Sequence, residues 1–135
     1  MSHFHTISTK IGLLRFNLIA TSVAAIDVKC AKTDVCFGLG IPDITASAGD
    51  GDIYFRLTAP SSASWVSLGQ GDQMDDANMF VVYTSSDGNN VTVSSRIGHG
   101  HRTPKLNSDA QLTLLDGSGL SDGIMTANVR CKTKS

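Results

Sequence analysis

A single methionine stands in the polar middle of the segment WVSLGQGDQMDDANMFVVY, residues 65–83. The thioether of Met74 is a soft, neutral donor that can bind haem iron, although methionine more commonly fills gaps in an apolar core. Its neighbours Gln73 and Asp75 are polar, so Met74 does not extend an apolar stripe. Met79 does extend one, in NMFVVY, and we expect it in the core. Spacing alone favours the core for Met74 as well, while its polar surroundings keep the ligand interpretation open.

Two histidines in the segment IGHGH have a spacing that can ligate zinc or copper. His99 and His101 are two residues apart, so their side chains share one side of an extended segment. A four-coordinate zinc site needs two further ligands, which the neighbouring sequence does not offer. A solvated pair beside a turn is therefore the favoured interpretation.

Other motifs for chemistry are missing from the chain. Asp72, Asp75 and Asp76 lack the loop spacing and terminal glutamate of an EF-hand, and we expect them to keep the loop soluble. The sequence contains no catalytic-type cysteine context and no P-loop lysine after Gly71. Neither a hydrolase nor a phosphate-binding loop is indicated.

The composition predicts one sheet-rich globular domain. The chain has 135 residues, a formal net charge of -1, 41% apolar residues, 17% charged residues and 13 glycines. This balance gives no nucleic-acid footprint and favours short strands with tight turns. Apolar runs predict seven strands in an all-β sandwich, which are Val35–Ile41, Asp52–Ala59, Ser64–Leu68, Asn78–Tyr83, Val91–Ile97, Ala110–Leu115 and Ile124–Cys131. The run MFVVY is apolar throughout and is predicted to lie deep in the sheet.

Residues 1–25 resemble a secretory signal peptide. Lys10 precedes the apolar stretch IGLLRFNLIATSVAA, which closes on small residues. Arg15 interrupts this stretch and argues against a membrane span. We therefore expect a secreted, extracellular protein, and His3 and His5 would be removed with the leader.

The cysteines and one sequon agree with export. Cys30 and Cys36 can close a small disulfide loop, which leaves Cys131 without a partner. The sequon Asn90-Val91-Thr92 follows the turn signal SSDGNN, so a glycan on Asn90 would project from a hairpin tip.

Three segments together resemble the fungal secreted DOMON family, specifically the cytochrome domain of cellobiose dehydrogenase. They are WVSLGQGDQMDDANMFVVY, DGNNVTVSSRIGHGHRTP and LLDGSGLSDGIMTANVRC. The resemblance implies an immunoglobulin-like β-sandwich that holds one haem b between a methionine and a histidine. Such a domain passes single electrons and has no catalytic activity of its own. Met74 matches the methionine ligand of the iron. His101 matches a ring near the haem propionates.

The resemblance also implies partners and an alternative. The electron donor would be a flavin dehydrogenase domain, and an extracellular copper oxygenase would be a further partner. In the family the histidine ligand and a second cysteine lie beyond the Val-Arg-Cys strand, where this sequence continues only as CKTKS. We therefore expect residues 26–135 to form a shortened domain, missing its last strands and impaired in haem binding. The alternative is a non-redox DOMON-like module that binds carbohydrate or a cell-wall surface.

Overall fold

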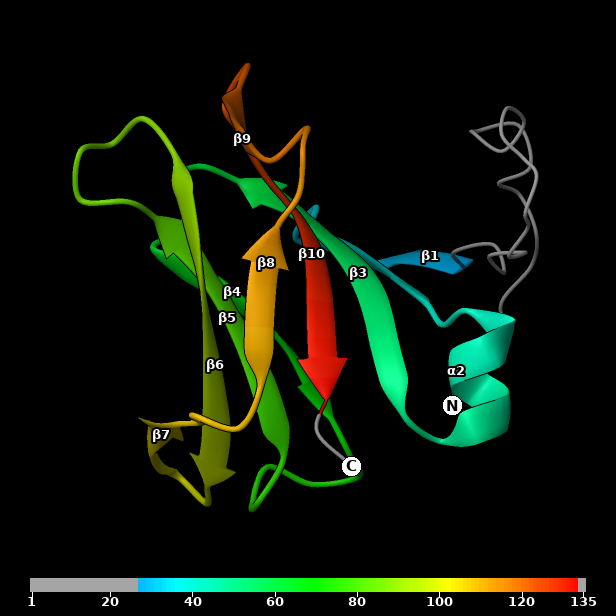
Figure 1. Ribbon diagram of the computed structural model, residues 1–135. Helices are drawn as coiled ribbons and strands as arrows, with labels where there is room; N and C mark the ends of the chain where they lie inside the picture. Colours follow the sequence, from blue (N-terminus) through cyan, green and yellow to red (C-terminus); the bar gives the residue numbers. More distant parts are fainter. Residues whose placement is uncertain (1–26, 134–135) are drawn as a thin grey trace, which may run out of the picture.

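The computed structural model describes residues 27–133, which form two antiparallel sheets packed face to face. Figure 1 shows the two layers, with β3, β10 and β8 in front of β4, β5 and β6. The first sheet has the order β1-β2-β3-β10-β8, with β9 added on β10; its strands are β1 Asp27–Cys30, β2 Cys36–Gly40, β3 Gly51–Pro60, β8 Gln111–Leu114, β9 Gly119–Ser121 and β10 Ile124–Thr133. The second has the order β4-β5-β6-β7, with β4 Trp65–Gln70, β5 Asn78–Thr84, β6 Val91–His99 and β7 Arg102–Leu106. The predicted all-β sandwich is confirmed.

Alternating apolar residues build the core between the sheets. Strands β3 and β10 pair along their whole length, and their inward positions are buried; these are Ile53, Phe55, Leu57, Ala59, Met125, Ala127, Val129 and Cys131. Phe80 and Val82 of β5 close the core from the other sheet, and the Phe55 and Phe80 ring centroids lie 4.6 Å apart. Because β-strand side chains alternate between faces, the other face of β5 is left for a different role.

Each of the seven predicted strands is present, with ends within two residues of the prediction. The sequence analysis missed β1, β7, β9 and the helix α2, Asp43–Ala48. These elements are short, and their formation depends on contacts with neighbouring elements. The helix ends at Gly49, whose φ of 72° is left-handed, and the Thr45 hydroxyl donates a hydrogen bond to the Asp52 carbonyl oxygen at the start of β3 (3.0 Å). Six helical residues are too few for a visible helical period.

Strand β5 differs from the prediction on one face. Its apolar run MFVVY is central in the second sheet, but only Phe80 and Val82 reach the sandwich core. Met79 is 5% exposed, yet it lies outside the core cluster and lines a cavity on the opposite face. Met79 is therefore buried as expected, but on the cavity face of β5 and outside the cluster between the two sheets. Both faces of this strand are apolar because each covers a different apolar space.

The cysteines separate into two environments. Cys30 and Cys36 form a disulfide that links β1 to β2 where these two residues pair. Cys131 is a free thiol, 1% exposed, and points into the core. The expected signal peptide, with His3 and His5, lies outside the described residues. Within residues 27–133, no helix has the length and apolar character needed to cross a membrane.

Candidate functional site

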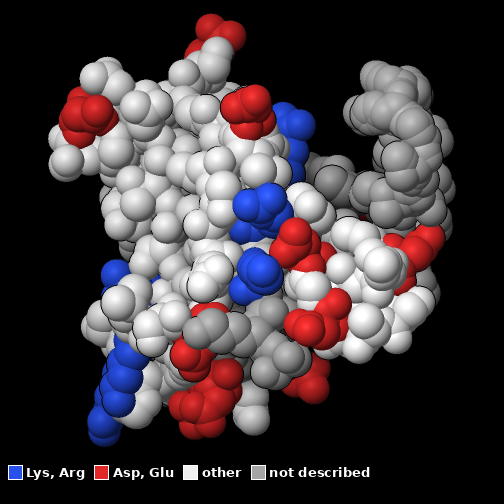
Figure 2. Space-filling view, in the orientation of Figure 1, with Lys and Arg blue, Asp and Glu red and all other residues white. Residues whose placement is uncertain are grey.

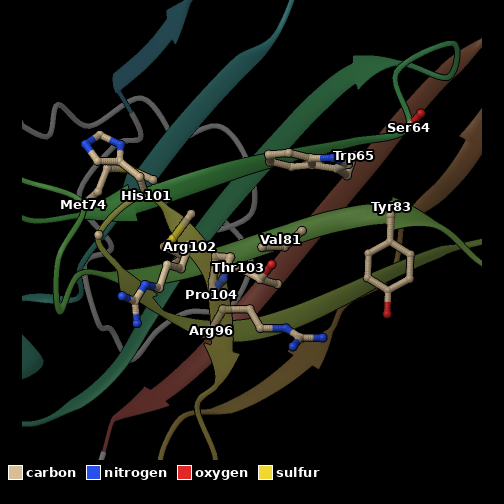
Figure 3. Close-up of a pocket in the computed structure, with 12 residues that line it drawn as sticks. Ser64, Trp65, Met74, Val81, Tyr83, Arg96, His101, Arg102, Thr103 and Pro104 are labelled. Carbon is tan, nitrogen blue, oxygen red and sulfur yellow. The ribbon is translucent and has the colours of Figure 1, made fainter.

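A cavity of about 780 Å³ lies on the face of the second sheet that points away from the sandwich core. Figure 3 shows side chains from β4, β5, β6 and β7 around it. The lining residues are Ser64, Trp65, Met74, Met79, Val81, Tyr83, Arg96, Gly100, His101, Arg102, Thr103 and Pro104. Its size is within the range of roughly 300–1,000 Å³ that is usual for ligand and cofactor pockets.

The floor of the cavity comes from one face of β5. Met79, Val81 and Tyr83 alternate with the two core residues of this strand, so all three point to the cavity side. Trp65 on β4 pairs with Tyr83, and its indole is 60% exposed at the rim. A planar apolar ligand would therefore find an apolar floor with an aromatic side chain at one end.

Met74 reaches the opposite end from the turn between β4 and β5. The backbone of this turn is hydrogen-bonded to the end of β6: the Asp76 amide donates to the Gly98 carbonyl oxygen (3.1 Å), and the Gly98 amide donates to the Ala77 carbonyl oxygen (2.8 Å). The side chain of Met74 lines the cavity and is 53% exposed. The turn before β5 and the end of β6 thus together place one thioether at the cavity mouth.

His101 comes to the same end from the turn between β6 and β7. This turn lies against the Met74 turn, since a β-carbon added to Gly100 would lie 4.0 Å from the Asp75 carboxylate oxygen. Figure 3 shows Met74 and His101 together, away from Trp65 and Tyr83. The structure therefore brings together the two residues that the family resemblance selected.

His99 does not line the cavity, although it lies only two residues from His101. Among residues 27–133, no three side chains of His, Cys, Asp or Glu come together as a metal-binding group. Asp72, Asp75 and Asp76 are exposed on the turn that carries Met74. The described part of the chain therefore contains no ready zinc or calcium cluster, and Met74 is the exposed thioether at the cavity.

Two arginines give the cavity a positive wall, which the sequence analysis missed. Arg96 pairs with Met79 across β5 and β6, so its side chain lies on the cavity face, and its Nε donates to the Ser94 hydroxyl (2.9 Å). Arg102 follows His101. Neither guanidinium forms an ion pair with another described residue. The alternation of VTVSSRIGH could have predicted that Arg96 lies on the face of its strand opposite to the face of Val93 and Ser95.

The charges at this end of the molecule are mixed. In Figure 2 basic side chains gather at the lower left, where Figure 1 places β7, and acidic side chains gather beside them along the lower edge. Strand β7 carries Arg102 and Lys105, and the turn with Met74 carries three aspartates. The cations inside the cavity favour a ligand with negatively charged groups.

The hairpin between β5 and β6 lies at the far end of these strands from Met74. Asp87 accepts hydrogen bonds from the Ser85 hydroxyl and the Asn89 amide, and together they hold the pKa of the Asp87 carboxyl below its usual value. Asn90 is exposed in this turn. A glycan on Asn90 would consequently lie away from the cavity.

Comparison with known proteins shows the family of the chain. Residues 14–134 match the protein family described as "Cytochrome domain of cellobiose dehydrogenase". The chain belongs to this family. The match begins inside the segment that we expect to be a signal peptide. No curated protein matches the sequence.

Two solved structures resemble the cytochrome-domain fold of the chain. The cytochrome b domain of pyranose dehydrogenase from Coprinopsis cinerea aligns with a TM-score of 0.66 at 22% identity, over 83% of this chain and 56% of that one. The cytochrome domain of Myriococcum thermophilum cellobiose dehydrogenase aligns with a TM-score of 0.58 at 15% identity, over 80% of this chain and 61% of that one. At these identities the likeness supports the fold alone. The chain spans less than two thirds of either domain.

Proposed function

We propose that this chain binds haem b in the cavity of the second sheet and serves as a secreted electron-transfer module. The observation that carries the proposal is the meeting of Met74 and His101, from two different turns, at one end of an apolar cavity. Cytochrome domains of this family bind haem b. The chain's membership in the family and the residues in its cavity point to the same ligand.

The residues fit such a ligand in three ways. The floor of Met79, Val81 and Tyr83 excludes water from a planar apolar group. The Met74 thioether is a donor of the kind that haem iron accepts. Arg96 and Arg102 supply unpaired cations for propionates at the cavity wall.

When bound, haem b would accept and release one electron at a time. In the proposal the Met74 thioether would hold the haem iron, and its neutral sulfur would favour ferrous over ferric iron, which raises the potential. His101 would donate a hydrogen bond from its ring to a propionate. The resemblance assigns a further iron ligand to a histidine beyond Cys131, so residues 26–135 would supply one of the two.

The surroundings of this module are also part of the proposal. Residues 1–25 are the leader, and residues 26–135 form the cytochrome domain. The Cys30–Cys36 disulfide supports export, since disulfides persist mainly in oxidising compartments. Electrons would arrive from a flavin dehydrogenase domain and leave to an extracellular copper oxygenase. A membrane span and a nucleic-acid partner form no part of this proposal.

A haemin titration of the purified chain tests the proposal. Absorption spectra of the oxidised and the dithionite-reduced protein should show haemin uptake, with a high-spin reduced spectrum that Met74→Ala changes. Met74→Leu is the matched control for side-chain volume. No haemin uptake by these residues would overturn the proposal. Uptake that survives Met74→Ala and fails in His101→Ala would overturn the ligand assignment.

A second candidate function rests on the exposed aromatic rim. Trp65 is 60% exposed beside Tyr83 on a flat sheet face, an arrangement that suits stacking on a sugar ring. This observation favours a non-redox module that binds carbohydrate or cell wall. Sedimentation with insoluble polysaccharide tests it: binding that is lost in Trp65→Ala, together with no haemin uptake, would replace the electron-transfer proposal.

A further inference from the structure

We infer that Met74 is a modification site for hydrogen peroxide, which oxidises its thioether selectively to methionine sulfoxide. The selectivity follows from the fold of the chain alone. Its consequence rests on the proposed function: oxidation would remove the soft donor from the cavity and so prevent haem ligation. This modification would make the cavity sensitive to a diffusible oxidant.

The three methionines in the described part of the chain differ sharply in their access to solvent. Met74 is 53% exposed, whereas Met79 is 5% exposed and Met125 is 1% exposed. Met79 lies in the cavity floor. Met125 lies in the core, where its sulfur accepts a hydrogen bond from the Thr84 hydroxyl (3.5 Å). Peroxide must reach the sulfur directly, so exposure controls the relative rates.

The fold also keeps Met74 in its exposed position. Gly98 fixes the backbone of the turn through hydrogen bonds with Asp76 and Ala77. Gly98 has no side chain, and the backbone of Met74 lies in the space that a β-carbon would occupy. Exposure at Met74 is thus built into the packing of the turn on β6.

The chemistry needs peroxide as its only co-reactant. A sulfur lone pair of Met74 attacks one peroxide oxygen, the O–O bond breaks, an S–O bond forms, and the other oxygen leaves as water after a proton transfer. The sulfur loses two electrons and the peroxide gains them. The product is polar and chiral, and methionine sulfoxide reductases reverse it. Its oxygen is a harder donor than the thioether sulfur.

Peptide mapping after a brief peroxide treatment of the apoprotein tests the selectivity. Cleavage before Asp75 or Asp76 places Met74 and Met79 on separate peptides, so mass spectrometry quantifies each sulfoxide independently. The exposed fractions of 53% and 5% predict oxidation of Met74 roughly tenfold faster than of Met79. This difference should disappear in denaturant. Equal rates in the folded protein, or faster oxidation of Met79, would overturn the inference.

A second measurement separates this inference from the proposed function. Peroxide is removed from the oxidised apoprotein, haemin is titrated, and a methionine sulfoxide reductase is then added. If Met74 is both oxidation site and ligand, haemin binding falls in proportion to the sulfoxide and returns on reduction; haemin binding by Met74→Leu responds to neither treatment. Selective oxidation of Met74 with unchanged haemin binding would keep the modification site and sink the ligand assignment.

Discussion

Gly98 of β6 lies directly against the backbone of Met74. A β-carbon added to Gly98 would overlap the Met74 carbonyl oxygen and lie 2.9 Å from its carbonyl carbon. The partners are backbone atoms, which cannot swing aside as the end of a flexible side chain can. The same glycine exchanges hydrogen bonds with Asp76 and Ala77 through its carbonyl and amide. The position of the Met74 thioether therefore depends on the absence of a side chain one strand away.

Replacing Gly98 with valine should displace the Met74 turn. We expect Gly98→Val to lower the free energy of unfolding by about 1–3 kcal/mol, since overpacking forces the backbone to shift. It should also move the Met74 methyl resonance in a ¹³C-methyl NMR spectrum and weaken haemin binding. The Met125 methyl, buried in the core, should move little.

Gly69→Val is the matched control for this substitution. Gly69 also lies on a strand of the second sheet, but a β-carbon there meets nothing nearer than the Asn78 carbonyl oxygen at 3.9 Å. We expect this variant to keep the Met74 resonance of the wild type. Equal displacement of Met74 by both variants would contradict the role given to Gly98.

The two arginines of the cavity should discriminate between charged and neutral ligands. If Arg96 and Arg102 bind propionates, haemin should bind more tightly than its dimethyl ester, by roughly tenfold for each charge-assisted hydrogen bond that is lost. The double variant Arg96→Gln, Arg102→Gln should reduce this preference, as measured by competitive spectroscopic titration. Arg56→Gln on the first sheet is the control. An unchanged preference in the double variant would show that other groups bind the carboxylates.

The sequence predicted the sandwich more completely than the site. Its seven main strands carry period-two alternation or apolar runs that are visible without a structure. The two faces of β5 could not be told apart, because Met79 and Phe80 are both apolar and both buried, one under the cavity and one in the core. The hydrophobic pattern of a strand shows that a face is apolar, but it does not show what covers that face.

The meeting of Met74 and His101 depends on pairing that no local signal contains. The family resemblance selected both residues, and the shared cavity follows from the register of β5 with β6 and from the contact at Gly98. Arg96 was recoverable in principle, because its place in an alternating strand fixes its face. The burial of Asn107 could not be predicted, because this residue lies in the loop that follows β7 and belongs to no alternating strand.

Removing the Asn107 amide should destabilise the second sheet. Asn107 is 8% exposed; its amide nitrogen donates to the Asn78 side-chain oxygen and its side-chain oxygen accepts from the Asp109 amide, each at 3.0 Å. Asn107→Ala removes both hydrogen bonds, which together contribute about 1–3 kcal/mol. Urea unfolding should report this loss, whereas Asn89→Ala, exposed in the hairpin, should change the free energy of unfolding by less than about 0.5 kcal/mol. Equal effects would remove the structural role of Asn107.

Cys131 should make the stability of the domain fall at alkaline pH. Burial raises the pKa of its thiol above the ordinary value of about 9.0, and the nearby Asp52 carboxylate adds to this effect. Above about pH 9 the unfolded chain therefore loses a proton that the folded chain keeps, so the unfolded state binds fewer protons and the free energy of unfolding declines as pH rises. The contribution is complete below that pH, and its slope is at most about 1.4 kcal/mol per pH unit.

Urea unfolding of the wild type and Cys131→Ala from about pH 8 to about pH 10 measures this dependence. The alanine variant should be less stable at pH 8, because it leaves a small cavity among residues such as Ile53 and Leu112. Its stability should nevertheless decline less steeply with pH, since every ionisable group other than Cys131 is common to both proteins. The two curves should therefore converge as pH rises. Parallel curves would mean that Cys131 ionises alike in the folded and unfolded chains, and that its burial does not hold the proton.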